Sequence, residues 1–520
     1  MTGPVPELRE RAEAAAERLL DADAVLVASH IDADGLTSGA IAARMLERAG
    51  IPYEVVFENQ LDEAAVDAIA ATDYGTVLFA DFGSGQLDFV RARAEAGAFA
   101  PVVADHHQPA EGDDGERLDA EYHVNPLVVG LDGASELSGA GATYVLARAL
   151  ADLGGVGAAD GAGTAVDGDA ETNGGDATAT PATVDPHNRD LAALAVVGAV
   201  GDMQASGGEL VGANRAIVEE GVAAGVLEEG TDLALYGTQT RPLPKLLEYA
   251  GDAGIPGVTG DERGAIRFLD DLDVELKGDG EWRRWVDLTD GEKRTVASGL
   301  VRRAVSRGVP ADRVNRLVGT TYVLTAETVG TELRDASEFS TLLNATARYE
   351  RADVGLAVCL GDRGDAYDRA RRLLSNHRRN LSTGIRLVER EGVDQRDHVQ
   401  WFHAGDRIRE TIVGIVAGMA IGADGVARDK PIVAFADKDE TVTVERDGEA
   451  VEVDAVKVSA RATGPLVADG VDLSAVMSEA AASVGGEGGG HDVAAGATVP
   501  ADRVEAFVDR ADELVADQRG

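Results

Sequence analysis

The first 150 residues alternate apolar runs with segments of helical periodicity, and this alternation is the feature that most constrains the fold. Four apolar runs are predicted to be strands: AVLVASH (24–30), IPYEVVFE (51–58), TVLFAD (76–81) and PVVADHH (101–107). Between them, helical patterns cover residues near 35–50, 60–71 and 86–97. Strands that alternate with helices at this spacing pair in parallel, with helices on both faces of the sheet. The sequence therefore predicts an α/β domain built on a parallel sheet.

The rest of the chain changes character several times. After a predicted helix at 138–154, residues 155–186 contain Gly, Ala, Asp and Thr and almost no large apolar side chain. We expect an acidic flexible insertion there, because such a segment cannot bury enough surface to become ordered. A helix at 190–203 resumes the first domain. The predicted domains are a first α/β domain over 1–235, a mostly helical connecting region over 236–334, and a smaller α/β domain over 335–520 that ends in a helix.

The last third of the chain contains three apolar runs that are also predicted to be strands: VGLAVCL (354–360), PIVAFAD (431–437) and AVKVSAR (455–461). Helices are expected near 338–349, 365–391 and 406–422. A glycine-rich turn is expected over 485–499, followed by a final amphipathic helix. This second pattern indicates a separate α/β domain.

Acidic and histidine side chains stand at the carboxyl ends of three predicted strands. HIDAD (30–34) begins at the end of the first strand, Asp81 closes the third, and ADHH (104–107) closes the fourth, while Asp202 ends the helix at 190–203. In an open parallel sheet, ligands bind at this edge. Carboxylates gathered there would repel one another strongly without cations. We therefore expect a divalent-metal centre, with ligands that suit Mn²⁺ or Mg²⁺ better than structural zinc.

Composition alone does not single out this centre, because the chain has 92 Asp and Glu against 48 Lys and Arg and a net charge of −44. Four other Asp-x-Asp pairs lack a histidine and a strand-end partner, so we interpret them as solvated surface. The acidic residues are dispersed, and six lysines accompany 42 arginines. This pattern is typical of a halophilic archaeal protein, in which molar salt shortens the range of self-repulsion to about 3 Å.

The sequence also bears on the cellular compartment. A single cysteine, Cys359, excludes a disulfide framework and a cysteine-based zinc site. The first 20 residues have the pattern of a charged amphipathic helix, which differs from a signal peptide. The longest apolar stretches, 191–200 and 411–423, are too short to span a bilayer. We expect a cytoplasmic protein without a membrane partner.

Four segments at these strand and helix ends, HIDADG, LFADFG, ADHH and VGAVGDM, resemble the first four motifs of the DHH phosphoesterase superfamily in order and spacing. Two later segments, KVSAR (457–461) and GGGHDVAAG (488–496), resemble the substrate-binding DHHA1 domain. With its long intervening region, the chain is most similar to the archaeal RecJ-like exonucleases. The resemblance implies an α/β fold with a parallel-sheet DHH domain and a smaller α/β DHHA1 domain.

The resemblance also implies a two-metal site, with Mn²⁺ favoured over Mg²⁺. The implied ligands are His30, Asp32 and Asp81 for one cation, and Asp34, Asp81, His106 and Asp202 for the other, with Asp81 as the bridge. The implied catalytic residues are Asp105, which would orient the cluster, and His107, which would contact the scissile phosphate. The implied substrate-binding residues are Ser459, Arg461, Gly489, Gly490 and His491.

The implied reaction is two-metal hydrolysis of single-stranded DNA or RNA to mononucleotides, in DNA repair or replication. Three alternatives remain open: a small-substrate DHH phosphodiesterase acting on short oligonucleotides or cyclic dinucleotides, a manganese pyrophosphatase, and a Cdc45-like replication factor that binds GINS. The GGGH turn disfavours a pyrophosphatase. Every implied ligand position is filled, which favours an active enzyme, and binding to GINS is compatible with activity.

Overall fold

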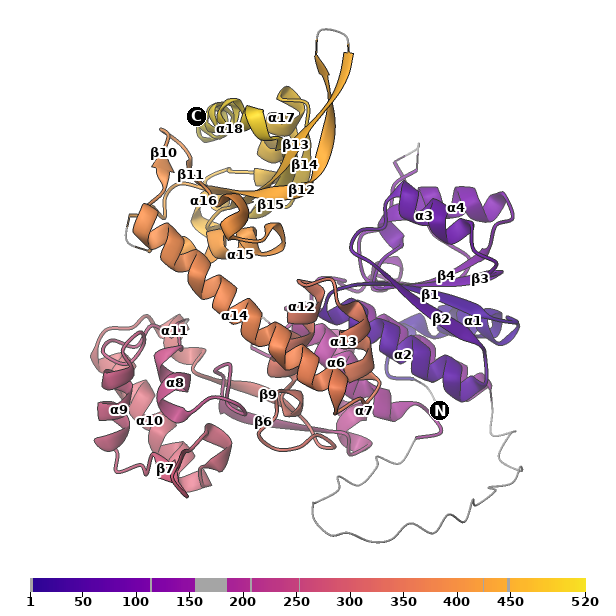
Figure 1. Cartoon of the computed structure of the whole chain (residues 1–520). Coiled ribbons are helices and arrows are strands. Elements are labelled where there is room, and N and C mark those ends of the chain that lie inside the picture. The colour runs from indigo at the N-terminus through magenta and orange to yellow at the C-terminus, as the bar shows by residue number, and fades with distance from the viewer. Residues whose placement is uncertain are drawn as a thin grey trace. The chain divides into compact units, whose positions relative to one another are not determined.

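The computed structural model describes residues 3–112, 115–154, 185–205, 208–251, 253–423, 425–446 and 449–520 (Figure 1). Residues 155–184 of the expected insertion lie outside this part of the chain. The chain forms two compact units, Met1–Arg371 and Arg372–Gly520, and each is described by itself. Among the described residues, no helix combines the length and apolar character that crossing a membrane would require.

The first unit contains the predicted parallel sheet. Its order is β2-β1-β3-β4-β5, and every neighbouring pair is parallel. The strands are β1 (Val25–His30), β2 (Tyr53–Glu58), β3 (Thr76–Ala80), β4 (Ala100–Ala104) and β5 (His123–Val124). The α/β fold class expected from the alternating pattern is confirmed, and the four predicted strands begin within two residues of the observed ones.

Helices cover both faces of this sheet because the side chains of each strand alternate between two apolar cores. Leu26 and Ala28 of β1 pack in a core with Val66 of α3 and Val90 of α4. The opposite face packs against a second group of helices. The helices of the two faces are α3 (Glu63–Ala70) and α4 (Leu87–Glu95) on one, and α1 (Arg9–Leu20), α2 (Ala33–Ala49) and α5 (Gly139–Leu153) on the other (Figure 1). α6 (Ala192–Gly201) packs on α2 and α5 and is followed by α7 (Gly212–Ala223).

A mostly helical region is inserted between two strands that pair antiparallel. β6 (Leu227–Leu233) leaves the first domain and β9 (Val318–Leu324) returns beside it, with Leu233 opposite Val318. The region has its own apolar core around the buried ring of Trp285, whose indole N–H donates to Asp232. Its elements are α8 (Leu243–Glu248), α9 (Glu262–Asp270), β7 (Lys277–Gly278), β8 (Glu281–Trp282), α10 (Asp290–Ser306) and α11 (Ala311–Asn315).

The strand predicted at 354–360 is wrong, because this apolar run forms the helix α13 (Ala352–Cys359). Short apolar runs do not distinguish a buried strand from a buried helix. A Cβ at Gly355 would lie 2.7 Å from the Leu36 side chain of α2, so glycine allows α13 to approach α2 closely. α12 (Ala336–Ala347) also packs on α2 and α6. Residues 336–359 therefore belong to the first unit. The second unit begins at Arg372, whereas we expected the last domain to begin at residue 335.

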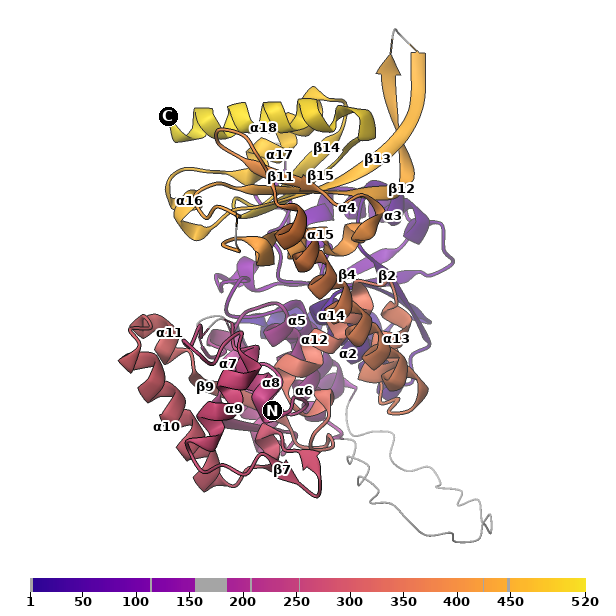
Figure 2. The same cartoon turned by 60° about the vertical axis from the view of Figure 1, so that its left-hand side comes forward.

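The second unit is built on a six-stranded sheet in the order β10-β11-β12-β13-β15-β14. α17 and α18 pack on one face and α15, with the end of α14, on the other (Figure 2). The strands are β10 (Asp394–Gln395), β11 (Gln400–His403), β12 (Ile432–Arg446), β13 (Glu449–Arg461), β14 (Glu487–Gly490) and β15 (Ala494–Pro500). The helices are α14 (Asp365–Glu391), which contains the division between the units, α15 (Glu410–Ala420), α16 (Gly464–Ala468), α17 (Leu473–Ser483) and α18 (Val504–Arg519).

The glycine-rich turn predicted over 485–499 is wrong over most of its length, because this segment forms the hairpin of β14 and β15. Glycine has a low strand propensity, which concealed the strand. Here it has a packing role, since a Cβ at Gly488 would lie 2.5 Å from the Met477 carbonyl oxygen of α17.

The fully buried carboxylate of Glu338 in α12 generates a prediction about stability. It accepts hydrogen bonds from the Gln239 backbone N–H at 2.7 Å and from the Thr240 hydroxyl, but burial outweighs them and raises the pKa of Glu338 to about 7. Because the folded-state pKa lies above the unfolded value near 4.5, the free energy of unfolding should fall as pH rises from about 4.5 to about 7. A shift of this size corresponds to roughly 3 kcal/mol.

Calorimetric midpoints measured from pH 5 to pH 8 test this expectation. The midpoint of wild type should fall relative to that of Glu338→Gln, which has no carboxylate to ionise. The control is Glu17→Gln, a change at an exposed glutamate of α1, whose midpoint should follow that of wild type across this pH range. Parallel midpoint curves for wild type and Glu338→Gln would contradict the role given to Glu338.

Candidate metal centre

The first predicted motif connects the end of β1 to the start of α2. Asp32 is the N-cap of α2, and its Oδ1 accepts from the Gly35 backbone N–H at 2.9 Å. The His30 Nδ1 lies 3.2 Å from the Asp32 Oδ2 and 3.7 Å from the Asp81 Oδ2. Burial alone would lower the pKa of His30, but Asp32 and Asp81 outweigh it and raise that pKa to about 11. The turn requires glycine at 35, since a Cβ there would lie 2.1 Å from the His30 carbonyl oxygen.

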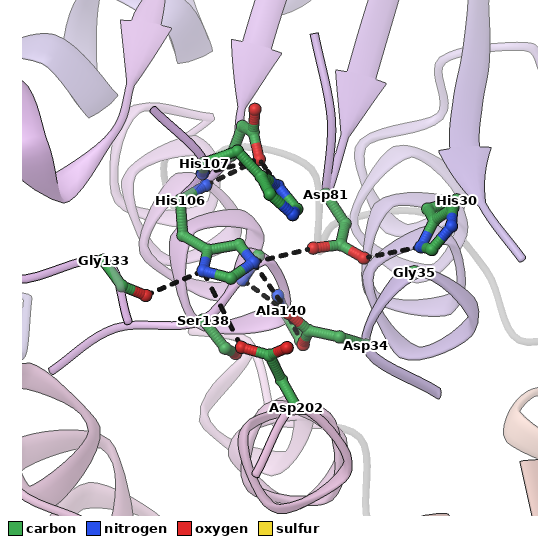
Figure 3. Close-up of polar contacts among 12 residues, drawn as sticks. His30, Asp34, Gly35, Asp81, His106, His107, Gly133, Ser138, Ala140 and Asp202 are labelled. Atoms are coloured by element: carbon green, nitrogen blue, oxygen red, sulfur yellow. Dashed lines mark hydrogen bonds and ion pairs between the residues drawn. The ribbon is translucent and has the colours of Figure 1, made fainter. Parts of the chain in front are cut away.

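Asp34 lies in the first turn of α2 and points at the start of another helix (Figure 3). Its Oδ2 accepts from the Gly139 N–H at 2.7 Å and its Oδ1 from the Ala140 N–H at 3.0 Å, both in the first turn of α5. The helix N-terminus favours a negative charge at this position. Burial, with the nearby carboxylates of Asp81 and Asp202, nevertheless raises the pKa of Asp34 well above its usual value.

Asp81 follows β3 and lies at the centre of the cluster. Its side chain is 2% exposed, and its backbone has a φ of +62°, a left-handed conformation that is rare for residues other than glycine. Its two oxygens face different histidines, with Oδ2 toward His30 and Oδ1 3.4 Å from the His106 Nε2 (Figure 3). Burial alone would raise the pKa of Asp81, but His106 and His30 hold it below the usual range.

The Asp81 Oδ1 provides the test of whether a cation fits. Within the described part of the chain this buried oxygen accepts no hydrogen bond. A buried carboxylate oxygen without a donor is strongly unfavourable unless a positive charge compensates it. No side chain can reach it from position 139 of α5, because a Cβ at Gly139 would lie 2.2 Å from this oxygen. The donor set of carboxylates and imidazoles around it therefore fits a divalent cation.

His106 follows β4 and is oriented by a backbone carbonyl. Its Nδ1 lies 2.7 Å from the Gly133 carbonyl oxygen, which places a proton on Nδ1 and directs Nε2 toward Asp81 and Asp34. This arrangement is the usual one for a histidine that binds a metal through its other nitrogen. Burial lowers the pKa of His106, but Asp81 and the neighbouring carboxylates outweigh it and raise that pKa.

Asp202 is the C-cap of α6 and joins this side of the cluster. Its Oδ2 lies 3.8 Å from the His106 Nδ1 and accepts from the Gln204 side-chain amide at 2.9 Å. Gln204 also donates to the Gly133 carbonyl oxygen. One amide therefore holds both the Asp202 carboxylate and the carbonyl group that orients His106. Burial raises the pKa of Asp202.

Asp105 is fully buried, and its carboxylate is occupied by hydrogen bonds from its neighbours. It accepts from the backbone N–H groups of Ser84, His106 and His107, and from the His107 Nδ1 at 2.8 Å. Burial alone would raise the pKa of Asp105, but the histidines hold it well below its usual value. The His107 side chain is 55% exposed, so its Nε2 is accessible while its Nδ1 is fixed. Asp105 thus positions both histidines of the DHH segment.

The structure gathers these eight side chains into three groups, and within each group the potential ligand atoms all lie within 4.8 Å of one another. The group around His30 and the group around Asp34 share no residue, but Asp81 of the first also faces His106 of the second. The groups are His30, Asp32 and Asp81; Asp34, His106 and Asp202; and Asp81, Asp105, His106 and His107. These clusters are able to hold metal ions.

Several residues that build this site were not predicted from the sequence. The backbone donors at Gly139 and Ala140, the Gly133 acceptor and the Gln204 amide have no polar motif of their own. Gly198 is also required, because a Cβ there would lie 2.3 Å from the Asp34 Oδ1. The small residues that begin α5, in SGAGA (138–142), were the available signal, since they allow a backbone to approach a carboxylate closely.

The predicted substrate-binding residues lie in the second unit and occupy neighbouring strands. Ser459 of β13 and Gly489 of β14 stand opposite Gly496 of β15, so the three form one row across the sheet. The side chains of Ser459 and Arg461 lie against Gly414 of α15. Gly490 ends β14, and His491 begins the exposed turn that follows.

Titration with Mn²⁺ should raise the thermal midpoint of the protein, because a cation that binds only the folded state stabilises it. The stabilisation is about 2.7 kcal/mol at a hundredfold excess over Kd. Asp81→Asn removes the charge that faces both histidines and should abolish most of the rise. Asp23→Asn, in an exposed Asp-x-Asp pair, is the matched control and should respond like wild type. An undiminished rise in Asp81→Asn would exclude Asp81 as a ligand.

Two protein families match parts of the chain: the DHH-CID domain over residues 235–318 and the DHHA1 domain over residues 398–517. The first match coincides with the region inserted between β6 and β9, and the second lies within the second unit. An uncharacterized protein of Methanocaldococcus jannaschii is 25% identical over 524 residues, which cover all of this chain and 99% of that protein.

Solved structures share the fold at low sequence identity. RecJ of Thermus thermophilus, in complex with Mn²⁺, matches with a TM-score of 0.57 and 18% identity over 99% of this chain. The chain spans 56% of the length of that protein. An exonuclease RecJ bound to manganese gives the same TM-score and identity, with 96% of its chain covered. CDC45 of Entamoeba histolytica matches with a TM-score of 0.62 and 11% identity over 98% of both chains.

The DHHA1 match includes both later motifs, at 457–461 and 488–496, and the fold likeness to an exonuclease RecJ covers 99% of the chain. The DHH motif residues themselves meet at one edge of the parallel sheet, as described above. The chain thus contains a region that matches the DHH-CID domain and a DHHA1 domain, and its overall fold is RecJ-like.

Proposed function

We propose that the protein is a metal-dependent exonuclease that hydrolyses single-stranded DNA or RNA to mononucleotides, in the cytoplasm and in the service of DNA repair or replication. The observation that carries the proposal is the position of Asp81 between two groups of potential ligands, with one oxygen toward His30 and the other toward His106. A carboxylate that bridges two cations is the usual arrangement for hydrolysis of a phosphodiester.

In this proposal the centre holds two divalent cations. His30, Asp32 and Asp81 would bind one of them. The ligands of the other would be Asp34, Asp81, His106 and Asp202. Mn²⁺ is favoured over Mg²⁺ because imidazole nitrogens belong to both sets, and Mg²⁺ prefers oxygen ligands alone. Such cations supply an activated water and neutralise the charge that develops on the phosphate.

The remaining groups position the substrate. Asp105 fixes the His107 ring through Nδ1, which leaves Nε2 free to donate a hydrogen bond to a phosphate oxygen. The raised pKa of His107, to which Asp105 contributes, favours the protonated ring that can donate this bond. In the second unit, Ser459, Arg461, Gly489, Gly490 and His491 would bind the nucleic acid, with the Arg461 guanidinium pairing with a phosphate.

A second role is favoured by the likeness to CDC45, which covers 98% of both chains. A replisome partner, with GINS as the candidate, is compatible with the nuclease because binding and catalysis need not share residues. An inactive Cdc45-like factor is disfavoured, since the chain retains a set of ligands clustered around one buried carboxylate. A phosphodiesterase for short oligonucleotides or cyclic dinucleotides is the remaining alternative.

Digestion of single-stranded DNA and RNA labelled at either end tests the proposal. With Mn²⁺ in molar salt, wild type should release mononucleotides, and chelation should stop the reaction. Asp81→Ala should lower kcat to background, whereas Asp23→Ala should leave it unchanged. Persistent digestion by Asp81→Ala would contradict the two-metal centre. Activity confined to dinucleotides would instead support the small-substrate alternative.

His107→Ala should separate metal binding from catalysis. The variant should retain the rise in thermal midpoint with Mn²⁺, because His107 is not among the proposed ligands. Its kcat should fall about 10²- to 10³-fold, the usual effect of removing one donor to a reacting oxygen. His187→Ala, at a partly exposed histidine of the same unit outside the cluster, is the control. A kcat within a few-fold of wild type would exclude a contact between His107 and the phosphate.

A further inference from the structure

A pocket of about 340 Å³ opens beside the candidate metal centre, within the first unit. Asp81, His30 and His107 form its border with the centre. The rest of its wall includes Asn59, Gln60, Leu61, Phe82, Gln86 and Gln108. Its volume lies at the lower end of the range for small-molecule sites, which suits one nucleotide rather than a folded or double-stranded segment.

The pocket is lined by amides in a chain that has few of them. The sequence contains nine Asn and eight Gln against 92 Asp and Glu, yet four of these seventeen amides line this one pocket. No glutamate lines it, and its one carboxylate is Asp81 of the metal centre. An acidic wall would repel a phosphorylated ligand, whereas neutral amides permit its approach.

Three of these amides are available to a ligand. Gln108 is held by the Arg117 guanidinium, which donates to its side-chain oxygen. The side chains of Asn59, Gln60 and Gln86, however, make no hydrogen bond to any other residue that the structure describes. Among all Asn and Gln residues that the structure describes, only one other side chain lacks such a hydrogen bond. It is Asn315 in α11, which lies outside the pocket. Free amides are therefore concentrated at the pocket.

The chemistry of the wall matches a nucleobase. Each amide offers two N–H donors and a carbonyl acceptor, and Asn and Gln pair with the mixed donor and acceptor edges of bases in this way. Leu61 and Phe82, which are 3% and 7% exposed, supply an apolar surface for the face of a ring. A base can reach such a wall only if it is unpaired and turned out of a stack.

We propose that this pocket binds the base of the nucleotide whose phosphate lies at the metal centre, with Asn59, Gln60 and Gln86 as its hydrogen-bonding residues. The inference rests on the proposed function and deepens it, since it assigns the base-binding residues. A pocket for an unpaired base would also explain why the proposed substrate is single-stranded. A duplex end must fray before its terminal base can enter the pocket.

Calorimetric titration of the Mn²⁺-loaded protein with AMP, UMP and ribose 5-phosphate tests the proposal without requiring catalysis. Wild type should bind at least one of the two nucleotides about tenfold more tightly than the sugar phosphate, the effect of one good base contact. The double variant Asn59→Leu/Gln86→Leu should bind all three ligands equally, with its affinity for ribose 5-phosphate unchanged. Asn315→Leu is the matched control, because it removes a free amide outside the pocket.

Equal affinity of wild type for the nucleotides and the sugar phosphate would overturn the inference, and so would a double variant that retains the difference. Thermal midpoints of the variants, measured with Mn²⁺, should equal that of wild type and so exclude misfolding as the cause. The proposed nuclease function is tested separately, because it would be contradicted by a wild-type protein that does not digest oligonucleotides. Loss of base-selective binding in the double variant should also raise KM for oligonucleotides about tenfold and leave kcat within a few-fold of wild type.

Discussion

The carboxylate of Asp81 lies between two imidazoles at the edge of the parallel sheet, and the rest of the site is arranged around it. Its left-handed backbone directs the side chain into the cluster, while its N–H remains bonded to the Ala104 carbonyl oxygen of β4 at 2.9 Å. The conformational strain of such a residue is sustained only where the surroundings fix it. Here the neighbouring strand fixes the backbone, and glycine at 139 leaves room for the carboxylate.

The electrostatics of the cluster explain why so many backbone groups are directed at it. Asp34 and Asp105 are buried carboxylates, and each is held by N–H donors rather than by lysine or arginine. Backbone donors bring partial positive charge without filling the space between the carboxylates. The carboxylates around Asp81 thus leave room for a cation, which would lie where several of their oxygens and two imidazoles meet.

Much of this site was predictable because its side chains follow hydrophobic strands directly. His30, Asp81 and His106 each occur at a point where an apolar run stops, and parallel strands bring such points together. The supporting groups were not predictable in the same way. Gly139 and Ala140 act through backbone N–H groups and lie more than 100 residues from Asp34, so neither residue type nor spacing identifies them. Their position depends on how α5 packs against α2.

The errors in the second half of the chain have equally local causes. VGLAVCL has no polar residue to reveal a period, so the packing of Gly355 on α2 decides between helix and strand. The hairpin of β14 and β15 is hidden by glycines that intrinsic propensity assigns to turns. Gly488 among them is required by the close approach of α17, an interaction between elements that a local pattern does not contain. The periodicity of the sequence thus predicted the strands and helices of the first domain well. It predicted poorly the elements whose conformation depends on close packing against a helix, namely α13 and the hairpin of β14 and β15.

The pairing of β6 with β9 has a consequence for the history of the chain. Because Leu233 stands opposite Val318, the intervening segment leaves and re-enters the first domain at one point, through a two-stranded stem. That segment has an apolar core of its own. A segment with both properties can be lengthened, shortened or exchanged during evolution without moving the sheet edge that carries Asp81. The stem therefore separates the candidate metal centre from changes in the size of the inserted region.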